Sequence, residues 1–279
     1  MEEEITTVFF LCDNLFKAMG IQEDPQVRMN NAEVMTVALC ASLFFSGNYE
    51  KSREFLSEHG YIHNMLSKSR FNRRLLAIPE TVWLALFNLL AELFKQTNEG
   101  DEYAMDSFPV PVCDNIRISR SRIYEGEEHR GYIPSKRRYF YGLRVHIVIT
   151  KTGEPVEFLL TPGALNDCRV LKQFDLDLPP GSAIYADKSY NDYGYEDLLK
   201  EAADISLNPL RKKNSKRAVA PWVTFLRKTL RRRVETTASQ INALFPKSIH
   251  AVTSRGFELK IILFYHSICI SMFVGRNLG

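Results

Sequence analysis

The sequence is poor in the residues that build zinc centres and disulfide frameworks. Five cysteines are scattered through its 279 residues, without a CxxC pair and without His-rich spacing around them. This scattering favours buried free thiols in a reducing compartment over disulfides or a zinc site. The five are Cys12, Cys40, Cys113, Cys168 and Cys269.

Long apolar runs are also missing. The longest extends from Ile261 to Val274 and is interrupted by His266. It is shorter than the roughly 20 residues that a membrane span requires, so we expect a packed C-terminal helix and no membrane partner. The first residues, Met1 to Glu4, lack the basic region of a signal peptide, and we therefore expect a cytoplasmic protein.

Acidic residues are absent from one long stretch. The net charge is only +3, yet residues 211–233 carry ten Lys or Arg and no Asp or Glu. Most charged blocks are solvated surface, but this density favours a polyanionic partner. The rest of the composition is ordinary for a globular protein, with 45% hydrophobic and 25% charged residues and no repeat or low-complexity tract.

Hydrophobic periodicity divides the chain near residue 100. Residues 1–99 show helical spacing throughout, whereas alternation with a period of two begins after Gly100. From residue 101 the expected order is strand, strand, strand, helix, strand, helix, strand, helix. We therefore predict an α/β fold with a ribonuclease H-like mixed sheet flanked by helices, although the order alone is shared by many α/β domains. The predicted domains are 1–99, all-helical, and 100–279.

Two aspartates stand where strands rarely place them. Asp106 lies inside the apolar run 103–108, and Asp187 closes the run 183–187. Because Asp is unfavourable in strands and seldom buried without a partner, the pair indicates a compensating cation, and a divalent metal is the leading candidate. A third acid, Glu235, follows on a helical stretch. Three such carboxylates can hold the two Mg²⁺ ions needed for displacement at phosphorus, and Mn²⁺ accepts the same ligands.

Structural roles for these acids compete with the metal hypothesis. A single Asp at a strand end often caps a helix or forms a turn. Arg231 and Arg232 precede Glu235 by four and three residues, so an exposed, salt-bridged glutamate is an equally simple interpretation.

Several motifs together resemble the DDE domain of bacterial insertion-sequence transposases. The resemblance covers residues 101–279, and residues 66–75 resemble the segment that precedes the domain in one group of these enzymes. The pattern departs from a related signature at three positions, where Lys228, Asn242 and Ser189 replace the usual Tyr, basic residue and Gly. The motifs are 105–108, the hairpin beginning at 141–146, 164–167, 186–190 and 231–235.

The resemblance implies a specific activity. A DDE transposase would use Asp106, Asp187 and Glu235 as catalytic metal ligands, hydrolyse the phosphodiester at transposon ends, and join the freed 3′-hydroxyl to target DNA. Its partners would be double-stranded DNA, at terminal inverted repeats and at the target, and a second copy of the chain in a DNA-bound homodimer. The alternatives are a catalytically inactive DNA-binding relic and a ribonuclease H-like nuclease without strand transfer.

DNA-binding residues are expected in both parts of the chain. Residues 49–77 resemble a helix-turn-helix whose second helix presents Arg70, Asn72, Arg73 and Arg74, types that suit reading of the major groove. For Trp222 we favour core packing over stacking on a base, and for His146 a structural role. The other candidate contacts are basic residues suited to phosphate: Lys136, Arg137, Arg138, Arg211, Lys212, Lys213, Arg227, Lys228, Arg231, Arg232 and Arg233.

Overall fold

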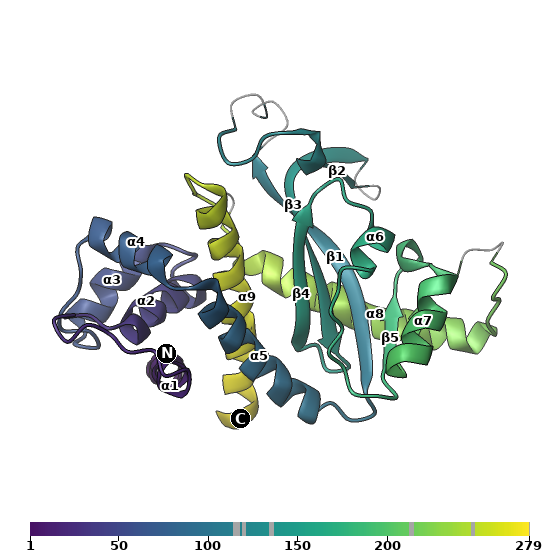
Figure 1. Cartoon of the computed structure of the whole chain (residues 1–279), viewed down its shortest axis with the longest axis horizontal. Helices are drawn as coiled ribbons and strands as arrows, with labels where there is room; N and C mark the ends of the chain where they lie inside the picture. Colours follow the sequence, from purple (N-terminus) through teal and green to yellow (C-terminus); the bar gives the residue numbers. More distant parts are fainter. Residues whose placement is uncertain (114–117, 119–120, 134–136, 212–214, 247–248, 279) are drawn as a thin grey trace. The chain divides into compact units, whose positions relative to one another are not determined.

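The computed structural model describes two compact units (Figure 1). It covers residues 1–113, 118, 121–133, 137–211, 215–246 and 249–278, with the side chains of residues 226, 230, 231, 277 and 278 outside the description. One unit comprises Met1–Leu90 together with Ile241–Gly279, and the other comprises Ala91–Gln240. The chain therefore leaves the first unit, builds the second and returns to the first.

The first unit is helical, as predicted for the N-terminal part. Its central helix, α2, begins with a capping box in which Asn30 and Glu33 each accept a hydrogen bond of 2.7 Å from the other's backbone N–H. Side chains around the whole of α2 are buried, and the helix packs against α1, α3, α4 and α9. The elements are α1 (Glu2–Ala18), α2 (Asn31–Phe44), α3 (Tyr49–Glu58), α4 (Lys68–Ala77), the start of α5 (Glu80–Gln96), the end of α8 (Pro221–Leu244) and α9 (Ser254–Leu278).

The C-terminal helix α9 is packed, as the sequence predicted. Its segment Ser254–Arg276 is long and apolar enough to cross a membrane by length and composition, but 61% of its most apolar window is buried within the structure. His266, the residue that interrupts the apolar run, is fully buried, and its Nε2 lies 2.8 Å from the Trp83 carbonyl oxygen. The polar ring thus fixes α9 against α5 inside the helical unit.

The second unit contains a six-stranded mixed sheet. Five of its strands follow the predicted ribonuclease H-like order, and the sixth, β2, was not predicted. β4, β3 and β1 are antiparallel neighbours, while β1, β5 and β6 run parallel, so the order across the sheet is β4-β3-β1-β5-β6 and β2 pairs with β3 as well. The strands are β1 (Glu102–Cys113), β2 (Arg130–Ile133), β3 (Arg138–Thr150), β4 (Pro155–Pro162), β5 (Ala183–Ala186) and β6 (Ser206–Pro209).

Helices flank this sheet. The short α6 (Asp167–Leu171) begins at Asn166, whose side chain caps the helix, and α7 (Tyr193–Ala203) is capped by Asp192 in the same way. The long α8 passes behind β1 and β4 in the view of Figure 1. β3 is buried along nearly its whole length, because the sheet is covered on both faces.

The predicted domain boundary differs from the boundary between the compact units. The predicted domains, 1–99 and 100–279, place α9 with the sheet, whereas compactness groups Ile241–Gly279 with the N-terminal helices because α9 packs on α2. As functional divisions, those limits stay a prediction.

In the helix-turn-helix-like segment, residues 59–67 separate α3 from α4. This connection is longer than the 3–4 residues of the usual motif.

Candidate active site

The sheet brings the two predicted aspartates to neighbouring positions on adjacent strands. In the parallel pair of β1 and β5, Met105 is opposite Ala186. The next residue on β1 is Asp106 and the next after β5 is Asp187. Because paired strands lie about 4.8 Å apart, the two carboxylates, distant from each other in sequence, start from adjoining backbone positions.

Both aspartates belong to the same face of the sheet. Side chains alternate along a strand, so Asp106 shares its face with Ala104, and Asp187 shares its face with Tyr185. Ala104 and Tyr185 are register partners, which places both pairs on one side. On the opposite side, the Ser107 hydroxyl donates a 3.2 Å hydrogen bond to Asp167 of α6. The aspartates therefore face away from α6.

The helix α8 crosses the face that carries the aspartates. Near its start, Arg227 donates to the carbonyl of Pro209 at 2.9 Å and to the Asn208 side chain at 2.7 Å, and its charge acts on the Tyr185 hydroxyl. Near its other end, the Thr237 hydroxyl donates to the carbonyl of Gly153 at 2.9 Å. Glu235 lies between these two anchors, on an exposed part of the helix.

The three carboxylates do not form a finished metal site. Within the described part of the chain, no group of three or more His, Cys, Asp or Glu side chains is arranged to hold a metal ion. The Oδ1 of Asp106 accepts a 2.8 Å hydrogen bond from the backbone N–H of Ser107. The donor set itself suits Mg²⁺ or Mn²⁺, because both prefer carboxylate oxygens. The structure thus sets Asp106 and Asp187 at neighbouring backbone positions, and a role for Glu235 as a third ligand stays a prediction.

A buried polar cluster, which the sequence analysis did not identify, supports β1 from its other face. Arg144 donates to the Ser107 hydroxyl at 3.3 Å and lies 3.6 Å from the Asp167 carboxylate. His146 is fully buried, with Nδ1 3.1 Å from the Tyr190 hydroxyl and Nε2 3.1 Å from Thr161. Asp167 and Tyr190 belong to the motifs 164–167 and 186–190, so these motifs were the signal in the sequence that could have indicated the cluster.

Burial controls ionisation in this cluster. Desolvation lowers the pKa of His146 to about 3, with the positive charge of Arg144 acting in the same direction. The Asp167 carboxylate lies 3.8 Å from His146 Nδ1 but does not offset the burial. Desolvation, together with the negative charges of Asp167 and Asp106, raises the pKa of Tyr190 well above its ordinary value. His146 and Tyr190 are thus a neutral, hydrogen-bonded pair, in agreement with the structural role expected for His146.

Sequence comparison decides the family. A family model described as "Transposase DDE domain" matches residues 96–249, more than half of the chain. The chain belongs to this transposase family. The matched segment contains Asp106, Asp187 and Glu235, and DDE transposase domains generally use divalent metals.

One solved structure has a distant similarity to this DDE transposase chain. No curated protein matches it. Among solved structures, a cryo-EM structure of the piggyBac transposase synaptic complex with hairpin DNA is similar, with a TM-score of 0.47 and 10% sequence identity, over 97% of this chain and 73% of that chain.

The basic residues of the DDE domain divide into internal and exposed groups. Arg211 makes two 2.7 Å hydrogen bonds to the buried Glu196, and Arg227 is buried in the contacts to β6 described above. Both guanidinium groups are therefore committed within the protein, and binding of DNA by them would require breaking these contacts. The exposed candidates are Arg137, Arg138, Lys228, Arg232 and Arg233. Lys136, Lys212, Lys213 and the side chain of Arg231 lie outside the described residues.

The expectation that Trp222 packs in the core is wrong. Its side chain is 67% exposed, and Phe225, one turn later, is 65% exposed. The reason is the helix phase: the buried positions Arg227, Val234 and Thr237 fix the face of α8 that meets the sheet. At 100° per residue, Phe225 falls opposite these positions and Trp222 falls to one side of them, outside the buried sector. Apolar character alone did not reveal which face of α8 the sheet covers.

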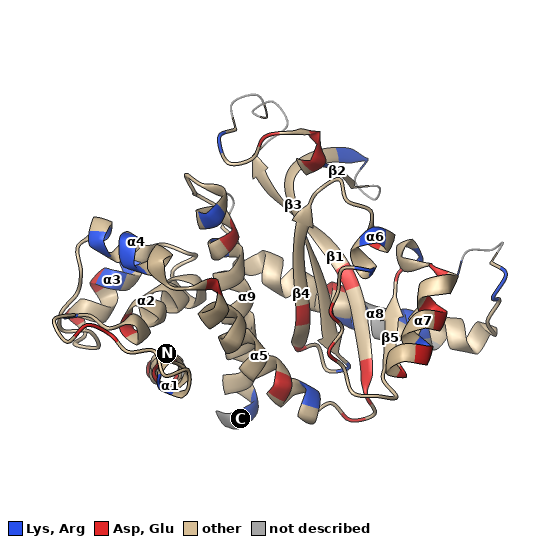
Figure 2. Cartoon of the chain, in the orientation of Figure 1, with Lys and Arg blue, Asp and Glu red and all other residues tan. Residues whose placement is uncertain are grey.

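Helix α4 uses its predicted DNA-binding residues in different ways. Arg70 and Arg73 are exposed, whereas Arg74 donates to Glu23 at 2.8 Å and to Asn31 at 2.7 Å and so connects α4 to the start of α2 and to the segment before it. Asn72 is half-buried at the edge of a pocket. Figure 2 shows the Lys and Arg positions along this helix. Arg70, Asn72, Arg73 and Arg74 stay predicted DNA contacts, of which Arg70 and Arg73 are exposed and Arg74 would have to leave its bonds to Glu23 and Asn31.

Proposed function

We propose that this protein is an active DDE transposase, which cleaves DNA at the ends of a mobile element and joins the freed 3′ ends to target DNA. The observation that carries the proposal is the register of β1 and β5, which sets Asp106 beside Asp187 inside the segment that matches the family. Parallel strands hold both carboxylates at fixed positions, as a site for two hard cations requires.

Asp106, Asp187 and Glu235 are the residues that would hold divalent ions, and the chemistry that such ions supply is charge neutralisation at phosphorus and activation of the attacking oxygen. In the first reaction a water oxygen bonds to phosphorus, the bond from phosphorus to the 3′ oxygen breaks, and that oxygen takes up a proton. In the second, the 3′-hydroxyl gives up its proton as it attacks a phosphate of the target, whose own 3′ oxygen leaves.

The chain's own residues support this chemistry in two ways. The backbone N–H of Ser107 bonds to Asp106, and the cluster of Arg144, Asp167 and Ser107 fixes the strand behind it. On α8, Lys228 and Arg232 lie one or two turns before Glu235 on a neighbouring side of the helix, Arg233 is exposed on a different side, and exposed Arg and Lys neutralise DNA phosphates. Double-stranded DNA at element ends and at the target is therefore the proposed substrate, bound by two copies of the chain.

The decisive experiment uses Asp106→Asn, which keeps the side-chain shape and removes the charge. We expect strand cleavage at a duplex carrying the element end, in the presence of Mg²⁺ or Mn²⁺, to fall by a factor of about 10³ or more, roughly 4 kcal/mol of activation free energy. Binding of the same duplex should change little, because phosphate contacts lie elsewhere. Asp197→Asn, an exposed acid paired with Arg217 in the same unit, is the matched control.

The outcomes separate the alternatives. Unchanged cleavage by Asp106→Asn would remove this residue from the site and contradict the proposal. Binding without any cleavage by the wild-type protein would indicate an inactive relic, and cleavage without joining would indicate a nuclease. Short inverted repeats bracketing the coding region would support the transposase directly.

A further inference from the structure

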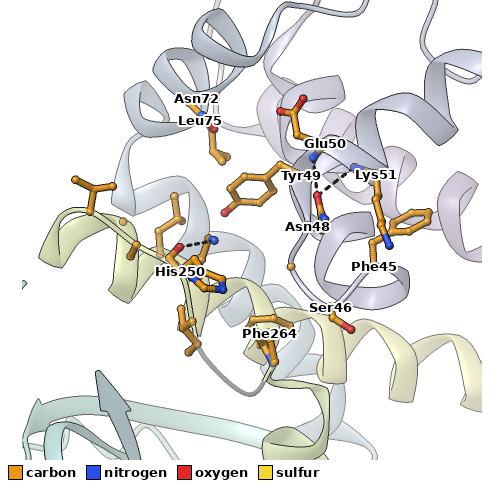
Figure 3. A pocket seen from close by; sticks show the side chains of 18 of the residues that line it. Phe45, Ser46, Asn48, Tyr49, Glu50, Lys51, Asn72, Leu75, His250 and Phe264 are labelled. Carbon is orange, nitrogen blue, oxygen red and sulfur yellow. Dashed lines mark hydrogen bonds between the residues drawn. The ribbon is translucent and has the colours of Figure 1, made fainter. Parts of the chain in front are cut away.

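A large cavity of the helical unit lies far along the chain from the aspartates and has no assigned role. Its volume is about 1080 Å³, at the upper end of the range for pockets that enclose small organic ligands. The start of α3, one side of α4, residues 249–253 and α9 form its walls, so every lining residue belongs to the same compact unit. Figure 3 shows these elements converging around Tyr49.

The floor of the cavity is apolar and partly aromatic. Phe264, Leu75 and Leu259 are buried side chains that line it, and the ring of Tyr49 projects among them (Figure 3). Gly47 permits this arrangement: its φ is +76°, and a Cβ added there would lie 2.9 Å from the Phe264 ring. The cavity can therefore accept the flat faces of a ring system.

Three lysines give the cavity a positive charge. Lys51 and Lys68 are exposed at its edge, and the half-buried Lys260 places Nζ 5.2 Å from the centre of the Tyr49 ring. In the described part of the chain, no carboxylate forms an ion pair with any of the three. The one acidic residue of the lining, Glu50, is bound at 2.9 Å by Arg53.

Lys260 is only partly satisfied by the protein. Its ammonium donates one hydrogen bond, 2.6 Å long, to the carbonyl of His250 (Figure 3), and an ammonium has three donors. Burial lowers the pKa of Lys260, which means that the charged form lacks part of the solvation it would have in water. An anionic group in the cavity would restore that stabilisation.

A fourth polar group comes from α4. Asn72 and Lys68 are four residues apart and share one side of the helix, towards the cavity, while Arg73 falls on a different side. A side-chain amide offers a donor and an acceptor together, which matches the edge of a nucleobase. Aromatic surface, amide and ammonium groups thus meet in one cavity.

We propose that this cavity binds a nucleoside phosphate, with the base against the ring of Tyr49, which the buried Phe264 backs, and the phosphate at Lys260 and the lysines of the edge. The nucleoside phosphate can be a free nucleotide or the last nucleotide of an unpaired DNA strand end, because both present a base and a phosphate. An acidic peptide would also neutralise the charge of the lysines, but it would leave the aromatic floor and the amide of Asn72 without a matching partner. The site is separate from the aspartates and does not depend on their activity.

The test measures binding of dAMP and of dCMP to the full-length protein by calorimetry. In parallel, fluorescence anisotropy compares a duplex with a short single-stranded overhang and its blunt counterpart. Lys260→Met should weaken binding of the mononucleotide, of the overhang, or of both by about tenfold or more. The double variant Lys51→Glu/Lys68→Glu changes only exposed side chains, so it should fold normally and show a similar loss. Lys17→Met, on α1 of the same unit and paired with Asp13, is the matched control.

Each outcome has a definite meaning. Binding of the mononucleotide with loss in the Lys260 variant supports a free-nucleotide site, and preference for the overhang with the same loss supports a strand end. Absence of saturable binding to all these probes, or equal binding by wild type and both variants, overturns the proposal. Displacement of bound dAMP by polyglutamate at equal charge concentration would overturn it in favour of an acidic peptide. Since none of these measurements involves cleavage, failure of the transposase chemistry would leave the result unaffected.

Discussion

At the scale of single residues, burial determines which charges this protein tolerates. His146 has no exposed surface and is neutral, held between the hydroxyls of Tyr190 and Thr161. Its pKa, about 3, lies below the 6.5 of an unperturbed histidine, so the unfolded state takes up a proton first as the pH falls. The stability that the neutral ring contributes is present above pH 6.5 and is lost progressively between pH 6.5 and about 3.

His146→Gln should therefore flatten the acid side of the stability profile, because glutamine can bond to both hydroxyls without titrating. We expect the loss of unfolding free energy between pH 7 and pH 4, on the order of several kcal/mol in the wild type, to shrink in the variant. Urea unfolding at a series of pH values measures it. The same change at the exposed His63 is the control, and parallel profiles for wild type and His146→Gln would contradict the interpretation.

The pair formed by Arg211 and Glu196 is the second residue-scale test. Both side chains are more than 90% buried and are joined by two 2.7 Å contacts. Glu196→Gln removes one charge and leaves the other buried, which typically costs about 3–5 kcal/mol. Thermal unfolding should show a much lower midpoint for this variant than for Asp197→Asn, whose carboxylate is largely exposed. Similar midpoints would mean that Arg211 is more solvated than its burial indicates.

At the scale of elements, helix α8 has two chemically different sides. Arg227, Val234 and Thr237 fix one side to the sheet. Phe225 and, two turns further on, Arg232 lie on the opposite side, and the exposed Trp222 lies at its flank. Exposed aromatic side chains alternating with cations are typical of surfaces that bind unpaired nucleic acid. The sequence contained this pattern, but only the helix phase shows that the aromatics face solvent.

Trp222→Ala should weaken binding of DNA that carries an unpaired stretch by about 1–3 kcal/mol, the usual contribution of one stacked base. The free energy of unfolding should hardly change, because the side chain is 67% exposed. Anisotropy titrations with gapped and fully paired duplexes measure the difference. Phe10→Ala removes an aromatic side chain of comparable exposure, 65%, from α1 and is the control. An equal effect of both variants would argue against stacking.

At the scale of the whole molecule, a modest net charge of +3 conceals a local basic surface. The double variant Arg232→Glu/Arg233→Glu should weaken binding to all DNA sequences. The slope of log K against log salt concentration should decrease by about one for each phosphate that the variant no longer neutralises. Charge reversal at Lys200, an exposed residue of α7 paired with Asp204, tests for a nonspecific charge effect. An unchanged slope in the α8 variant would show that these arginines do not contact phosphate.

The sequence was sufficient for five of the six strands, but not for β2 or for the side-chain partners. The period of two after Gly100 predicted strands, and the positions of Asp106 and Asp187 in apolar runs predicted a shared metal site. The parallel register of β1 and β5 sets these two positions side by side. The internal partners of Arg211 and Arg227 could not be foreseen, since a basic run looks the same whether its members contact solvent or Glu196. The position of α9 likewise depends on long-range packing with α2, which local periodicity does not encode.

The discontinuous helical unit has a consequence for biosynthesis. The ribosome delivers α2 early, whereas α9, which covers part of its apolar surface, emerges only after the entire sheet unit. A nascent chain therefore exposes an apolar surface of α2 throughout the synthesis of residues 91–240. During that time the inserted sheet unit can fold, but the helical unit cannot be completed. Chains terminated before Ser254 would keep this surface uncovered, and they should be held by chaperones or degraded even though Asp106, Asp187 and Glu235 are all present.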